Sequence, residues 1–115
     1  MYIFINSDIN LSKGQACAQT SHITHLIIDE IVRSVYETNP VPEYYMKYLE
    51  WCSEPITIIK KASLDQLSEL MKLPLTKYFY DDIYDKKTNC KYHHLTVVAF
   101  YPGYVPGNVD EFNLL

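Results

Sequence analysis

The sequence contains few of the residues on which several common kinds of protein depend. Of its 115 residues, three are cysteines (Cys17, Cys52 and Cys90), three are glycines and one, Arg33, is an arginine. The cysteines are odd in number, widely spaced and without a CxxC pair, which argues against a disulfide framework and favours a reducing compartment. With one arginine, bidentate recognition of phosphate or carboxylate groups is almost unavailable.

Long apolar runs and several well-known catalytic motifs are missing as well. No stretch approaches the length of a membrane span, and the opening residues MYIFINSDIN do not have the charged leader and apolar segment of a signal peptide. The P-loop, the G-x-G-x-x-G fingerprint and the G-x-S-x-G motif are absent, so nucleotide hydrolysis and covalent serine hydrolysis have no support. We therefore expect a cytoplasmic protein without a membrane partner.

The residues that are present indicate one globular domain, 1–115. Apolar residues make up 48% of the chain, which is enough for a single core. The net charge of −4 argues against binding nucleic acid through overall charge, because neutralising phosphates needs a basic surface. A local basic patch on an acidic body remains compatible with this charge.

Periodicity predicts the fold class. Apolar runs predict four strands, and apolar residues at three- and four-residue spacing predict three helices. The strands are expected at 1–6, 55–62, 78–85 and 95–102, the helices from Lys13 to about 36, at 43–54 and at 63–72, and a polar loop at 86–94. Strands separated by helices imply crossover connections. The sequence thus predicts an α/β fold, a three-layer α/β/α domain with a mixed, mostly parallel four-stranded sheet.

The stretch LSKGQACAQTSH, residues 11–22, is the first candidate for a functional site. Ser12 and Gln15 form a capping box, so a helix should begin near Lys13, as Ser63 and Gln66 predict for a later helix. The segment follows the first strand, where α/β folds bind ligands, and a helix N-terminus with Lys13 beside it suits an anion. The alternative is that Lys13 is simply solvated and Gln15 only caps the helix.

Gln19 and His22 lie one turn apart on one face of that helix. An amide and an imidazole facing a cleft could orient a water or polarise a carbonyl. The alternative is that Gln19 bonds across a packed interface and His22 is a half-buried structural histidine. His22, His25 and Cys17 lack a second ligand cluster with recognisable spacing, so we expect no metal site.

The predicted loop at 85–94 is the densest basic stretch of the chain and a candidate for contact with phosphates. It could equally be a solvated loop, and three acids beside it would partly neutralise its charge. The basic residues are Lys86, Lys87 and Lys91, and the acids are Asp81, Asp82 and Asp85.

The stretch D-x-N-L-S-K-G-Q-A-C-A-Q-T-S-H, from Asp8 to His22, resembles the N-terminal signature of the type-2 (archaeal and eukaryotic) peptidyl-tRNA hydrolases. That family has a strand, a D-L/M turn, a K-G-K-type loop and a helix opening A-A-Q-x-S-H. ITIIKKASLDQLSEL, KKT and LTVVAFYP resemble its second strand and next helix, its G-R-T loop and its last strand, with the same eight-residue step from Thr88 to Thr96. The resemblance covers most of the chain and is weakest at 36–54.

The resemblance implies hydrolysis, by water and without metal or cofactor, of the ester that joins a peptide to the terminal ribose of tRNA. By position, Lys13 would hold phosphate, Gln19 and His22 would line the cleft, and Thr88 would position water or substrate. Lys87 stands where the family has arginine. The implied catalytic set is Lys13, Gln19, His22, Thr88 and an acid from Asp82 or Asp85, and the implied tRNA contacts are Lys13, Lys86, Lys87 and Lys91.

The chain departs from the family pattern in the loops. The second loop lysine falls at Gln15, the aspartate before the G-R-T triplet aligns with Tyr84, and the glycine of the triplet is Lys86. Two other functions therefore stay open. One is a binding module that keeps the fold without turnover. The other is a homo-oligomeric interaction protein using the tyrosines between 36 and 51, and the resemblance is compatible with a homodimer.

Overall fold

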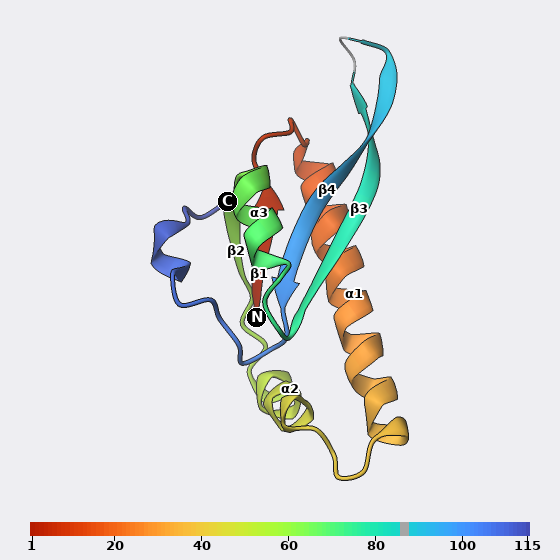
Figure 1. Ribbon diagram of the computed structural model, residues 1–115, viewed down its shortest axis with the longest axis vertical. Coiled ribbons are helices and arrows are strands. Elements are labelled where there is room, and N and C mark those ends of the chain that lie inside the picture. Colours follow the sequence, from red (N-terminus) through yellow and green to blue (C-terminus); the bar gives the residue numbers. More distant parts are fainter. Residues whose placement is uncertain (86–87) are drawn as a thin grey trace.

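The computed structural model describes residues 1–85 and 88–115, and Lys86 and Lys87 lie outside the described residues. The order of elements is the predicted one (Figure 1). They are β1 (Tyr2–Asn6), α1 (Lys13–Glu37), α2 (Glu43–Ser53), β2 (Ile58–Ala62), α3 (Leu64–Leu70), β3 (Thr76–Asp85), β4 (Cys90–Phe100) and a short 3-10 helix, η1 (Val109–Glu111). Both predicted capping boxes are present and confirm where α1 and α3 begin.

The four strands form one mixed sheet in the order β2-β1-β4-β3. The prediction of a mostly parallel sheet was wrong. β1 and β2 run parallel, whereas β1–β4 and β3–β4 are antiparallel pairs. The reason is the short connection between β3 and β4, because strands joined by a tight turn can pair only as an antiparallel hairpin.

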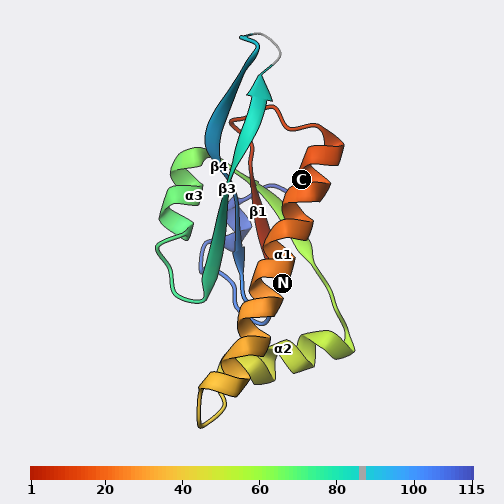
Figure 2. The same ribbon diagram turned by 90° about the vertical axis from the view of Figure 1, so that its right-hand side faces the viewer.

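Helices cover both faces of the sheet, which confirms the three-layer α/β/α architecture (Figures 1 and 2). On one face, the isoleucine stripe of α1 packs against apolar side chains of β1 and β4. On the other face, Leu67 and Leu70 of α3 pack with Phe4, Val98 and Phe100. The stripe consists of Ile23, Ile27 and Ile31, all fully buried.

The tyrosines that motivated an oligomeric function lie mostly on α2. Tyr44, Tyr45 and Tyr48, together with Trp51, pack against the core beneath α1. Tyr36 at the end of α1 is 87% exposed. Most of this aromatic cluster therefore has a structural role, and the homodimer stays a prediction.

The predicted loop at 86–94 is largely strand. β4 begins at Cys90 and pairs with β3 along its whole length. β1 pairs with β4 at residues 97–99, and the Asn6 side chain also donates to the Leu95 carbonyl. Beyond these contacts β3 and β4 continue past the sheet as two strands (Figures 1 and 2). Residues 80–85 and 90–95 are called the hairpin arm below. Polar residues are tolerated there because both faces of an unsupported hairpin can meet water.

Among the helices of residues 1–85 and 88–115, none has the length and apolar character needed to cross a membrane. Nor do three or more His, Cys, Asp or Glu side chains of these residues gather as metal ligands would. The three cysteines are all free and exposed.

Glu30 ties the C-terminal half of α1 to β3. Its carboxylate accepts a hydrogen bond from Lys77 Nζ at 2.7 Å. Partial burial alone would raise the pKa of Glu30, but hydrogen bonds from Lys77 and Tyr101 and the charge of Lys77 outweigh burial and lower that pKa.

We expect Glu30→Gln to lower the free energy of unfolding at neutral pH by up to about 1 kcal/mol, the usual range for an exposed ion pair. The pKa of Glu30 is lower in the folded chain than in the unfolded one. Its contribution is therefore present above the unfolded pKa and is lost as the pH falls through the folded pKa. Urea unfolding of both proteins at neutral and acid pH measures this, and a difference that stays constant in acid would contradict it.

Candidate functional site

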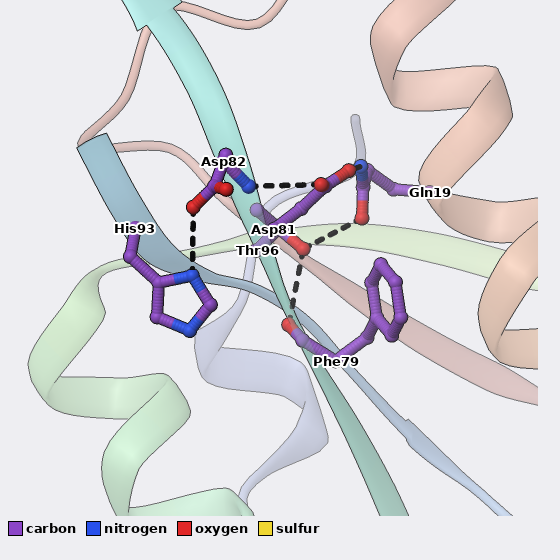
Figure 3. Close-up of polar contacts among 6 residues, drawn as sticks. All are labelled: Gln19, Phe79, Asp81, Asp82, His93 and Thr96. Atoms are coloured by element: carbon purple, nitrogen blue, oxygen red, sulfur yellow. Dashed lines mark hydrogen bonds and ion pairs between the residues drawn. The ribbon is translucent and has the colours of Figure 1, made fainter. Parts of the chain in front are cut away.

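A chain of buried polar contacts joins α1 to the base of the hairpin arm (Figure 3). Gln19 Nε2 donates to Asp81 Oδ2 at 2.8 Å, and Thr96 Oγ1 donates to Gln19 Oε1 at 2.6 Å. Thr96 Oγ1 also lies 3.1 Å from the carbonyl oxygen of Phe79. Gln19 comes from α1, Asp81 from β3 and Thr96 from β4, so this cluster links three elements that are distant in sequence.

A β-bulge places Thr96 in the cluster. The pairing of β3 with β4 shifts between Phe79, opposite Val97, and Tyr80, opposite Leu95, so Thr96 has no partner of its own. Thr96 contacts α1 and Val97 belongs to the core on the same face, although neighbours in a regular strand point to opposite faces. Bulges are known to re-aim side chains beside functional sites.

The cluster fixes which way the Gln19 amide points. An ionised carboxylate only accepts hydrogen bonds, so the amide nitrogen must face Asp81 and the amide oxygen must face the Thr96 hydroxyl. The other carboxylate oxygen, Asp81 Oδ1, accepts from the backbone N–H of Asp82 at 2.8 Å. Asp81 is thus held through both oxygens, and charge-assisted hydrogen bonds of this kind are among the stronger ones in proteins.

Gln19 and its neighbour His22 differ in solvent exposure. Gln19 is 2% exposed, so it does not line an open cleft in the way the sequence suggested. His22 is exposed and lies one turn further along α1, where its ring centroid is 5.4 Å from that of Phe79. Asp81 is half-buried. Asp81 and His22 are therefore the polar groups of this region that an incoming molecule can reach.

Asp82 lies on the other face of the hairpin. Its Oδ1 is 2.9 Å from His93 Nδ1, and both side chains are more than 60% exposed (Figure 3). The predicted choice between Asp82 and Asp85 as the site acid is not what the structure places against Gln19. The acid there is Asp81. Alternation along β3 puts Asp82 on the opposite face, and the side chain of Asp85 is outside the described residues.

The remaining predicted residues lie further along α1 and the arm. Lys13 is exposed in the first turn of α1, six residues and about 9 Å along the helix from Gln19. Thr88 is exposed in the turn before Cys90, and Cys90 is six residues, about 20 Å, along β4 from Thr96. Lys91 is exposed opposite Tyr84. The side chain of Asp85, like Lys86 and Lys87, is outside the described part of the chain.

Three further residues of the N-terminal signature, Asp8, Ser12 and Gln15, have structural partners. The Ser12 backbone N–H donates to Gln15 Oε1 at 2.8 Å, and the Gln15 backbone N–H donates to Ser12 Oγ at 3.1 Å. Asp8 Oδ2 accepts from the backbone N–H of Leu64 at 2.8 Å, which ties the loop after β1 to the start of α3. Gln15 is therefore engaged in capping the helix, which agrees with the alternative interpretation of the sequence, that Gln15 only caps α1.

Sequence reasoning missed Asp81 and Thr96 as members of the cluster. The sequence indicated Asp81 only as an acid that partly neutralises the basic stretch at 85–94. It indicated Thr96 only as the residue eight positions after Thr88 in the last strand. If Phe79 is taken to face α1, alternation along the strand puts Asp81 on the same face. Tyr78 and Tyr80 are equally aromatic, however, and taking them to face α1 would put Asp81 on the opposite side. The bulge at Thr96 leaves no signal in the sequence.

We expect Thr96→Val to lower the free energy of unfolding by about 1–3 kcal/mol, because it leaves the buried Gln19 Oε1 without a donor at nearly constant volume. Thr96→Ser keeps the hydroxyl and should lose clearly less. Urea unfolding midpoints of the three proteins at equal m-values measure this. Equal losses for valine and serine would show that the methyl group, not the hydrogen bond, matters.

The chain matches the family model described as peptidyl-tRNA hydrolase PTH2 over residues 1–112. A comparison with curated proteins gives no match. The matched residues include α1, β3 and β4, and so the whole polar cluster. The match spans nearly the full length, as the resemblance of its N-terminal segment indicated, and the chain therefore belongs to the peptidyl-tRNA hydrolase PTH2 family.

Proposed function

We propose that this protein hydrolyses the ester between a peptide, or an N-blocked amino acid, and the 3′ ribose of tRNA. Family membership supports the reaction class. The observation that carries the proposal is the Gln19–Asp81–Thr96 cluster, which holds one half-buried carboxylate on the α1 face, where His22 is exposed one turn along the helix from Gln19. A held carboxylate that solvent can reach suits general-base activation of water.

In the proposed reaction a water molecule attacks the ester carbonyl. Asp81 or His22 takes the proton of that water, the carbonyl–oxygen bond to the ribose breaks, and the ribose oxygen leaves with a proton. Gln19 acts as a positioning residue, because its buried amide holds Asp81 and cannot itself meet much of the substrate. Asp81 would then take the place of the family aspartate that aligns with Tyr84.

We propose that tRNA approaches from the side of the arm and of the N-terminus of α1. Lys13 adds a positive charge to the partial charge of the helix N-terminus, a combination that suits phosphate. Lys91, opposite Tyr84, lies on the face of the arm away from the cluster, so it would reach a different part of the tRNA. Thr88 and Asp85 lie toward the arm's end, which favours contact with the body of the tRNA over contact with the ester. Lys86 and Lys87 are assigned to tRNA from the sequence alone.

Neighbouring acids provide a matched test of the site. We expect Asp81→Asn to lower kcat for hydrolysis of N-acetyl-aminoacyl-tRNA by a factor of about 100 or more, the usual scale for losing a general base. The carbonyl oxygen of an asparagine can still accept the hydrogen bond from Gln19, but its amide nitrogen cannot accept the one from the Asp82 N–H, so the charge and one of the two hydrogen bonds are lost. Asp82→Asn, on the other face, should stay within about twofold of wild type.

Release of the labelled amino acid at saturating substrate measures kcat, and unfolding curves check that each variant is folded. Gln19→Ala should lose activity as well, because Asp81 is then no longer held. If Asp81→Asn stays active while Asp82→Asn is inactive, the site lies on the other face and this assignment is wrong. If all variants match wild type, the cluster is structural only.

A binding module without turnover is the alternative, and Gln15 favours it. Gln15 stands where the family has its second loop lysine and is engaged in the helix cap. With glutamine in place of that lysine, the side chain caps the helix and does not contact phosphate. Such a protein could keep weaker tRNA binding and lose catalysis.

Gln15→Lys separates the two functions. For an active hydrolase we expect a lower KM for tRNA, from the added phosphate contact, and a small loss of stability from the broken capping box. For a module without turnover, the same change should strengthen tRNA binding without any release of amino acid. Binding and release are measured on the same preparations, so the two outcomes are distinct.

A further inference from the structure

The face of the hairpin arm that continues from the polar cluster carries two aromatic side chains. Asp81 faces α1, because its carboxylate contacts Gln19. Residues directly opposite in an antiparallel pair share a face, so His94, opposite Asp81, lies on this side. Ile83 follows Asp81 by two residues, and Tyr92 lies opposite Ile83. The rings of Tyr92 and His94 are 6.2 Å apart, which agrees with this assignment.

These two rings are open to solvent. Tyr92 is 43% exposed and His94 is half-buried, so both rings present surface to solvent. An isolated two-stranded hairpin is at best marginally stable in water. The arm therefore offers aromatic surface that a bound molecule can cover.

The distance from Tyr92 to the polar cluster fits a short run of unpaired nucleotides. Tyr92 is four residues along β4 from Thr96, which is about 13 Å at 3.3 Å per residue. Stacked nucleotides rise by about 3.4 Å each, so three to four of them span this distance. A strand whose last ribose lies at the Gln19–Asp81 cluster would bring its preceding bases over His94 and Tyr92.

Stacking also suits the charge of the protein. The chain has a net charge of −4 and one arginine, so binding by phosphate neutralisation is limited. Base–aromatic stacking needs no positive charge and tolerates any base. Stacked aromatic side chains are the usual means by which proteins hold unpaired RNA.

From this juxtaposition we propose that Tyr92 and His94 form a stacking surface for the unpaired nucleotides at the 3′ end of tRNA and lead that end to the Gln19–Asp81 cluster. The inference rests on the proposed function for the identity of the RNA. The other face of the arm, with Tyr80, Tyr84 and His93, has no continuity with the cluster and is not part of this surface.

The test uses an RNA tetranucleotide, ACCA, labelled at its 5′ end and titrated with the protein by fluorescence anisotropy. We expect Tyr92→Ala to weaken binding about tenfold or more, the usual loss for one stacked base. Tyr92→Phe keeps the ring and should bind like wild type. The matched control is Tyr84→Ala, because Tyr84 is 45% exposed on the opposite face of the same arm and its hydroxyl bonds Asn89 in the turn.

Hydrolysis of N-acetyl-aminoacyl-tRNA is measured on the same variants, and for an active enzyme Tyr92→Ala should raise KM with little change in kcat. Tyr92-dependent binding of ACCA without hydrolysis by wild type would support the stacking surface and refute the proposed function. Equal binding by wild type and Tyr92→Ala would overturn the stacking surface, whatever the activity. Equal loss of ACCA binding by Tyr84→Ala would also overturn it, because the integrity of the arm would then be the cause.

Light scattering completes the test. If Tyr92→Ala splits a dimer without affecting ACCA binding, the surface serves a second copy of the chain and the inference is wrong.

Discussion

The buried amide of Gln19 is the interaction on which the arrangement of α1 and the hairpin depends. Isoleucine side chains give α1 most of its contact with the sheet, but apolar packing is non-directional and tolerates small shifts. A carboxamide that is 2% exposed must instead satisfy both its oxygen and its nitrogen, and a lost partner costs about 1–3 kcal/mol. The two hydrogen bonds of Gln19 therefore fix where α1 lies along β3 and β4 and how it is rotated.

The same constraint connects the β-bulge to the site. Without the extra residue in β4, Thr96 would point away from α1, and Gln19 Oε1 would need another donor. With it, the cluster holds Asp81 on the α1 face while Asp82 pairs with His93 on the other. Alternation along β3 puts Asp81, and not Asp82, beside the helix, and the irregularity in β4 adds the hydroxyl donor that holds Gln19 against it. The same irregularity decides which aromatic side chains of β4 share a face with that carboxylate.

Features determined by neighbouring residues could be predicted from the sequence, and features determined by pairing could not. The capping box at Ser12 and Gln15 and the isoleucine stripe of α1 depend on local spacing, and both are present. The direction of β4, the extension of strand into 90–94 and the choice of Asp81 over Asp82 depend on which strands meet and in what register. A shift of one residue reverses every side chain of a strand, so sequence alternation alone cannot supply that register.

The scarcity of arginine bears on how this chain could meet RNA. A protein that relies on phosphate contacts gains affinity with each cation and loses it steeply as salt is added. Here lysines stand singly near the candidate site, with Lys13 at the helix start and Lys91 on the arm, and Asp81 and Asp82 add negative charge close by. Repulsion between these carboxylates and phosphates would weaken a backbone-only mode of binding, whereas contact with the bases avoids them. An acidic chain with exposed rings beside a held carboxylate is therefore better suited to a few unpaired nucleotides than to the charged body of a duplex.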